Sequence, residues 1–160
     1  MKRILSLIVS VLMLAGMLAG CFGGTKEYTC QDVTMTVPSA MTDVSSNSEF
    51  KDFTFALDSK KVAIFGLKED FSDFDGEDIS LEDYADAVIE ANGLDALAIS
   101  RSGHDYMYFR YEAKSGDGTY KYLAGVYKGK DGFWLIQVAS LVTQYDETAF
   151  FEYLDSVKLA

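Results

Sequence analysis

Acidic residues are concentrated in one stretch of the sequence, and closely spaced carboxylates are the ligands that calcium prefers. Residues 70–82 read DFSDFDGEDISLE. With Gly76 at the sixth position of an EF-hand loop, positions 3, 5 and 12 fall on Asp73, Asp75 and Glu82. The stretch is therefore a partial match to a calcium-binding loop.

Other positions of this loop do not match the EF-hand pattern. Phe71 falls at position 1, which needs a carboxylate, and Asp78 falls at the apolar position 8. The preceding residues are typical of a strand, whereas an EF-hand has a helix there. A calcium site formed by Asp73, Asp75 and Asp78 outside that frame stays open. The sequence favours the alternative, a solvated loop whose acids lead into a helix N-terminus.

Tyrosines form the second concentration of functional side chains, since six of the ten lie within residues 106–127. On an extended strand Tyr106, Tyr108 and Arg110 share one face, and the residues between them share the other. If the residues between them face the core, this face is an exposed aromatic platform for a protein or a glycan. The alternative is cross-strand pairing of these aromatic residues beneath a covering helix.

The sequence contains few of the residue patterns that are typical of catalytic sites. His104 is the single histidine, which excludes a zinc site built from several histidines. No serine lies in a nucleophile-elbow pattern, and no glycine-rich phosphate loop is present. Cys30 has no basic neighbour in sequence and is expected to be a small buried residue. We expect a protein that is not an enzyme, and the alternative is a hydrolase built around His104 from distant residues.

The N-terminus has the pattern of an export signal. Two basic residues precede an apolar run over residues 4–14, and residues 18–21 read LAGC. This tetrapeptide resembles the lipobox of bacterial lipoproteins, which implies lipidation of Cys21 and attachment to the extracytoplasmic face of a membrane. The alternative is an ordinary secretory peptide. The predicted organisation is a signal peptide over 1–20, a lipidated Cys and tether over 21–27, and one domain over 28–160.

The net charge of the mature chain indicates which classes of molecule it can bind. After removal of the signal peptide, 12 basic residues face 25 acidic ones, a net charge of −13. Nucleic acid is disfavoured, because binding to it requires clustered Lys and Arg side chains. We expect the lipid anchor to attach the protein to the membrane. We expect its binding partner to be an envelope or extracellular protein or glycan.

The elements that position these residues follow from hydrophobic periodicity. Period-two alternation predicts a strand over 28–37 that Pro38 ends, and then a hairpin over 53–57 and 62–67, with the second strand central. A helical stripe begins at residue 81, with Ser80 as its cap and Gly93 at its end. Four strands over 96–101, 104–113, 119–127 and 133–141 precede a last helix near 150–157, capped by Thr143 or Asp146. The order predicts an α+β fold with a largely antiparallel sheet of about six to seven strands and two main helices.

Three segments carry a resemblance to a known family. The strand VTMTVP at 33–38, the aromatic strand FWLIQV at 133–138 and the helix AFFEYLDSV at 149–157 resemble those of PsbP-like proteins. That group shares an α/β/α sandwich with the Ran-binding Mog proteins and the DcrB lipoproteins. The resemblance implies a binding or accessory role and transfers no catalytic residue. We therefore expect a membrane-anchored, non-catalytic binding module, with a metal- or small-ligand-binding module using the 70–82 loop as the alternative.

Overall fold

The computed structural model describes residues 24–74 and 78–160. Two α-helices are present in them, α1 (Leu81–Ala91) and α2 (Glu147–Asp155), together with the 3₁₀ turns η1 (Ser48–Phe50), η2 (Phe71–Phe74) and η3 (Val142–Gln144). The strands are β1 (Thr25–Cys30), β2 (Val33–Pro38), β3 (Thr42–Asp43), β4 (Phe55–Asp58), β5 (Ala63–Asp70), β6 (Ile99–Ser100), β7 (Tyr106–Ser115), β8 (Gly118–Lys128), β9 (Gly132–Leu141) and β10 (Lys158–Leu159).

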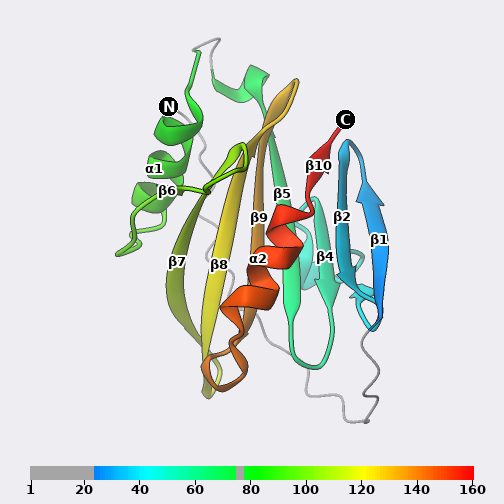
Figure 1. The fold of residues 1–160 in the computed structure, drawn as a ribbon. Coiled ribbons are helices and arrows are strands. Elements are labelled where there is room, and N and C mark those ends of the chain that lie inside the picture. Colours follow the sequence, from blue (N-terminus) through cyan, green and yellow to red (C-terminus); the bar gives the residue numbers. More distant parts are fainter. Residues whose placement is uncertain (1–23, 75–77) are drawn as a thin grey trace.

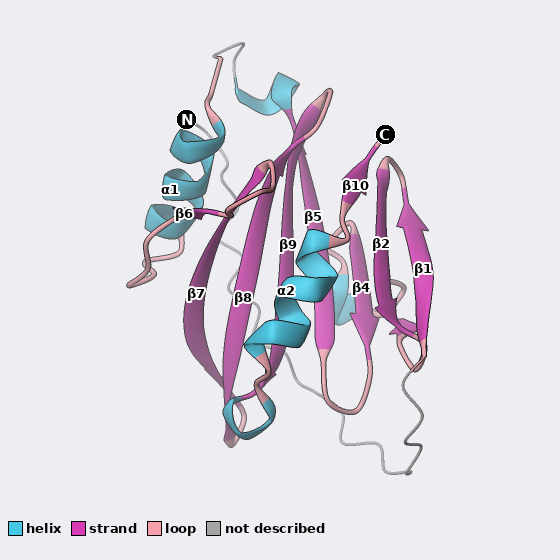
Figure 2. Ribbon diagram, viewed as in Figure 1, coloured by secondary structure: helices cyan, strands magenta, loops and turns pink. Residues whose placement is uncertain are grey.

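The strands form two antiparallel sheets (Figures 1 and 2). The larger sheet has seven strands in the order β3-β4-β5-β9-β8-β7-β6, and the smaller has the order β1-β2-β10. The predicted α+β fold with a largely antiparallel sheet and two helices is confirmed. The second strand of the predicted hairpin is central, because β5 pairs with both β4 and β9.

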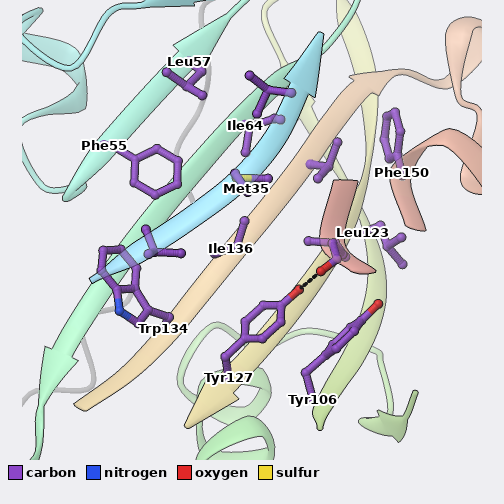
Figure 3. Close-up of a cluster of buried hydrophobic side chains, with 14 of the residues drawn as sticks. Met35, Phe55, Leu57, Ile64, Tyr106, Leu123, Tyr127, Trp134, Ile136 and Phe150 are labelled. Carbon is purple, nitrogen blue, oxygen red and sulfur yellow. Dashed lines mark hydrogen bonds between the residues drawn. The ribbon is translucent and has the colours of Figure 1, made fainter. Parts of the chain in front are cut away.

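The core lies on both faces of the large sheet. On one face, β2 and α2 pack against the sheet and bury Met35, Phe55, Ile136 and Phe150 (Figure 3). On the other face, α1 covers β7–β9, and the η1 segment covers the β4–β5 side. Burial of an apolar stripe on each covering element is what holds the helices to the sheet. The α2 face is the one that carries the candidate site.

Both helices begin at capped residues. The Ser80 hydroxyl accepts a hydrogen bond from the Asp83 backbone N–H at 3.0 Å, and Gly93 follows the helix with a φ of 60°. The predicted start and end of α1 are confirmed. At α2, the Asp146 carboxylate accepts from the Ala149 N–H at 3.2 Å. Of the two candidate caps Asp146 is therefore the right one, since Thr143 lies within η3.

The predicted single strand over 28–37 is wrong. It is a hairpin of β1 and β2, and its turn lies at Gln31, with a φ of 52°, and Asp32. Two side chains from the large sheet reach Asp32 Oδ1: Lys68 Nζ lies 3.1 Å away and Trp134 Nε1 3.2 Å away. Long-range contacts therefore stabilise a turn that contains no glycine. The hairpin begins at Thr25, inside the predicted tether.

The predicted meander of four strands is confirmed for β7, β8 and β9, which pair antiparallel over their length. Its first strand is shorter than predicted, because only Ile99 and Ser100 pair with β7. Cys30 is half-buried at the end of β1, not fully buried as expected, with its Sγ 4.0 Å from the Thr54 carbonyl oxygen. No helix within 24–74 and 78–160 is long and apolar enough to cross a membrane. The predicted signal peptide and Cys21 lie outside the described residues.

Candidate functional site

The predicted tyrosine platform starts at a residue that the structure buries. Tyr106 lies in a row across the sheet with Tyr127 and Trp134, and only 4% of its surface is exposed. Helix α2 covers Tyr106 and Tyr127 of this row, and the Tyr127 hydroxyl donates a hydrogen bond to the Leu154 carbonyl oxygen at 2.8 Å (Figure 3). The expected exposed placement of Tyr106 is therefore wrong. The alternative from the sequence, aromatic pairing beneath a covering helix, is the arrangement found here.

Asp155, at the C-terminal end of α2, gathers the polar groups beside Tyr106. It accepts hydrogen bonds from the Tyr106 hydroxyl at 2.5 Å and from Arg101 Nε and Nη2 at 3.0 and 2.6 Å. His104 Nε2 lies 3.6 Å from the same carboxylate. The Arg101 hydrogen bonds, and that of Tyr106, hold the pKa of Asp155 below its usual range. Burial and the neighbouring carboxylate raise the pKa of Tyr106, so it remains a hydrogen-bond donor.

An open pocket of about 370 Å³ adjoins this cluster. It lies between the loop that carries His104, the end of β8 at Lys128 and the C-terminal end of α2. Among the described residues that line it there is no serine, threonine or cysteine, so none of these supplies a nucleophile beside His104. The hydrogen bonds of Asp155 instead join the β6–β7 loop to α2. We interpret the cluster as a structural support for the surface next to it.

That surface consists of aromatic and arginine side chains packed on one another. The Tyr108 and Phe151 rings meet edge to face with centroids 4.9 Å apart. Arg110 Cζ lies 4.9 Å from the Tyr108 ring centroid, and Arg101 Cζ lies 3.9 Å from that of Phe151. Tyr108 and Arg110, two residues of the predicted platform, are thus brought together and are partly exposed. Phe151 from α2, in place of the buried Tyr106, completes this group of side chains.

Two exposed aliphatic residues extend the surface to the edge of the sheet. Ile99 pairs with Tyr108 and is 44% exposed, and Leu97 is 81% exposed. Val142, at the opposite end of the sheet, is the third exposed large hydrophobic residue among those described. We call the continuous region the edge surface; its residues are Leu97, Ile99, Arg101, Tyr108, Arg110 and Phe151.

Ion pairs fix both arginines of the edge surface. Arg101 pairs with Asp155, and Arg110 Nε donates to Glu147 Oε1. The Tyr145 hydroxyl donates to the same Glu147 oxygen at 3.1 Å. The hydrogen bond from Arg110, followed by that from Tyr145, lowers the pKa of Glu147. Each guanidinium is therefore held over an aromatic ring by an ion pair, with little rotamer freedom left to lose on binding.

The edge surface includes residues that sequence reasoning did not select. Phe151 belongs to the predicted last helix, but the sequence does not indicate that it contacts Tyr108 of β7. Leu97 and Ile99 alternate in sequence with the less exposed Ala96 and Ala98. An alternation that places the larger apolar residues outward is a signal that a search for exposed strand edges would have found.

The acidic loop does not assemble a metal site in the described part of the chain. Asp78 pairs with Lys128 Nζ at 3.4 Å, and Asp73 is exposed in η2. Within 24–74 and 78–160, no three His, Cys, Asp or Glu side chains lie close enough together to hold a metal ion. Asp75 lies outside the described residues, so calcium binding by Asp73, Asp75 and Asp78 stays a prediction.

Comparison with known proteins gives the fold. No family model and no curated protein matches the sequence. The solution structure of the cyanobacterial PsbP protein CyanoP from Synechocystis sp. PCC 6803 is similar, with a TM-score of 0.53 at 13% identity over 93% of this chain and 99% of that one. A crystal structure from Bacteroides thetaiotaomicron VPI-5482 has a TM-score of 0.56 at 10% identity over 81% of this chain. This chain spans only 45% of the length of the Bacteroides chain. The described residues thus adopt an α+β fold similar to that of PsbP.

Proposed function

We propose that this chain is a lipid-anchored extracytoplasmic module that performs no catalysis and binds a protein partner through the edge surface. The observation that carries the proposal is the composition of that surface. Tyr, Arg and Phe side chains, stacked on one another and surrounded by exposed aliphatic residues, are the types that dominate binding energy at protein interfaces. The PsbP-like fold supports an accessory role, since the sequence resemblance implies one.

Rigidity of the surface supports the same proposal. Ile99, Tyr108, Arg110 and Phe151 lie on β6, β7 and α2, and ion pairs hold both arginines. A preorganised surface loses little conformational entropy on binding, so more of its contact energy contributes to affinity. Membrane attachment through Cys21, as the LAGC pattern implies, would concentrate such a module near partners in the same envelope.

Photocrosslinking in the native host tests the proposal. A benzoylphenylalanine in place of Leu97 should crosslink to one defined protein, because Leu97 is the most exposed of the large hydrophobic residues described. The matched control is the same replacement at Val142, which is also an exposed aliphatic residue but lies at the other end of the sheet. Equal products from both positions, or none from Leu97, would contradict the proposal.

A pair of double variants sharpens the test. Tyr108→Ala with Arg110→Ala removes one cation–π pair of the edge surface, and we expect a loss of the Leu97 crosslink by roughly tenfold or more. Lys128→Ala with Phe71→Ala removes a similar pair, with Lys128 Nζ 5.6 Å from the ring centroid, on the α1 side of the sheet. We expect this control to keep the crosslink. An equal loss in both would indicate a general loss of folding.

A further inference from the structure

Within residues 24–74 and 78–160, strand β6 has a neighbouring strand on one side of its backbone only. It is the last strand of the seven-stranded sheet, and its partner is β7. The Arg101 N–H donates to the Tyr106 carbonyl oxygen at 3.0 Å, which places Arg101 at a hydrogen-bonded position of this antiparallel pair. Because such positions alternate, the N–H and C=O of Ser100 point away from β7, toward the open edge.

Apolar side chains lie beside these backbone groups. Ile99 pairs with Tyr108 and therefore lies on the α2 side of the sheet, within the edge surface. Leu97 precedes it by two residues and is more exposed. An unpaired strand edge beside exposed aliphatic residues is a template for another strand. Natural sheets usually protect such an edge with charged or proline residues, and residues 97–100 contain neither.

Acidic residues lie before and after this edge in the chain. Asp95 and Asp105 are both exposed, and no ion pair found within the described residues uses either of them. The two arginines close by are already paired with Asp155 and Glu147. The charged side chains near β6 that can still contact a partner are therefore Asp95 and Asp105, and both are negative. A second copy of this chain, whose net charge is −11, would bring like charges together at this edge.

We propose that β6 binds an extended segment of a partner protein, which adds to the large sheet as a further strand. The segment has alternating apolar residues that contact Leu97 and Ile99, and basic residues that reach Asp95 and Asp105. This inference rests on the proposed function and specifies its mode of binding. Backbone hydrogen bonds to Ser100 provide affinity, and the flanking apolar and acidic side chains select the sequence.

Substitutions at Ser100 separate backbone pairing from side-chain contact. Ser100→Pro removes the outward N–H, and it leaves the hydrogen bond from Arg101 to β7 in place, because proline is tolerated at an edge whose N–H faces solvent. Ser100→Ala keeps the N–H and is the matched control. Thermal unfolding of both variants shows whether the domain remains folded. Asp95→Lys with Asp105→Lys, two exposed positions, tests the charge preference without touching the strand.

The probe is a displayed library of random heptapeptides, selected on the purified full-length protein. We expect selected peptides to alternate apolar residues with Lys or Arg and to bind the wild type and Ser100→Ala equally. Their affinity should fall roughly tenfold for Ser100→Pro and for the double lysine variant, the effect of one lost hydrogen bond or charge-assisted contact. N-methylation of alternate peptide residues should abolish binding.

Three outcomes would overturn the inference. They are the selection of no peptide, equal binding of selected peptides to Ser100→Pro, and a dimer in sedimentation analysis that Ser100→Pro dissolves. The last would mean that a second copy occupies the edge. Repeating the Leu97 crosslink in the Ser100→Pro protein separates this inference from the proposed function. A crosslink that persists there means that the edge surface binds its partner without strand addition.

Discussion

Asp155 shows how a single carboxylate can link three separate parts of the chain. It sits at the end of α2 and accepts hydrogen bonds from Arg101, after β6, and from Tyr106, at the start of β7. A hydrogen bond between charged groups is stronger than a neutral one, and this pair is bidentate. At the residue scale, then, the position of α2 over the sheet depends on the ionised state of Asp155.

We expect Asp155→Asn to destabilise the protein by about 2 kcal/mol at pH 7, the range for hydrogen bonds to a charged group. Arg101 holds the pKa of Asp155 below its value in the unfolded chain, so the unfolded chain binds more protons in acid. The stabilisation is complete above the unfolded pKa of about 3.9 and is lost as pH falls below it. Urea unfolding at several pH values should therefore show the two proteins converging in acid.

Asp105→Asn is the matched control for this experiment. Asp105 lies in the loop between β6 and β7 that also carries Arg101, is exposed and takes part in none of the ion pairs found among the described residues. Its substitution should change the free energy of unfolding by less than about 0.5 kcal/mol. A difference for Asp155→Asn that stays constant down to pH 2 would show that the lost stability does not come from the charge.

At the element scale, the sequence predicted the parts whose signals are local. The helical stripe with Ser80 before it and Gly93 after it predicted α1, and the turns near 115–118 and 129–132 predicted the meander. The β1–β2 hairpin was missed because its turn depends on Lys68 and Trp134, which lie far from Asp32 in sequence.

The candidate site was predicted in part, for the same physical reason. Alternation placed Tyr106, Tyr108 and Arg110 on one face correctly. Alternation carries no information about how far a helix from elsewhere in the chain reaches across that face. Helix α2 buries Tyr106 but leaves Tyr108, which packs against Phe151 of the same helix, partly exposed, and only the tertiary structure contains that difference.

Pairing of β4 with β5 depends on a glycine. Gly66 lies opposite Phe55, whose ring occupies the space above it, and a Cβ at residue 66 would lie 2.0 Å from Phe55 Cε1. Gly66→Ala should therefore displace a fully buried ring and destabilise the protein by about 1–3 kcal/mol, as overpacking does. Thermal unfolding measures the effect. Gly24→Ala is the control, since its Cβ would meet Ser39 Oγ at 3.4 Å, an ordinary contact, and we expect a change near zero.

At the scale of the whole molecule, the start of β1, which follows the predicted anchor in sequence, and strand β6 lie toward opposite ends of the sheets (Figure 1). Only residues 22–24 separate Cys21 from β1, a length of at most about 14 Å from Cys21 to Thr25. Strand β1 runs away from that point for about 17 Å, toward the end where α2 finishes and β6 lies (Figure 1). A lipid on Cys21 would therefore place β6 on the side of the molecule that faces away from the membrane.

The anchor is tested by exchanging each cysteine in turn. Cys21→Ser should move the protein from the membrane fraction to the soluble extracytoplasmic fraction and abolish labelling by an alkyne-tagged fatty acid. Cys30→Ser is the control, because Cys30 lies in β1 and is the only other cysteine in the sequence. It should keep both the label and the membrane location. Membrane retention by the Cys21→Ser protein would contradict the proposed anchor.

The small sheet joins segments from both ends of the chain. Strand β10 pairs with β2, so Leu159 lies opposite Val33, and the Ala160 N–H donates to the Asp32 carbonyl oxygen at 2.8 Å. In a chain that emerges from the ribosome or an export channel with its N-terminus first, β2 can pair with β1 at once, but its other edge stays unpaired until almost all of the domain has followed. The small sheet can therefore be completed only after residues 158–159 have emerged. A chaperone that shields β2 during export would protect an exposed strand edge from aggregation.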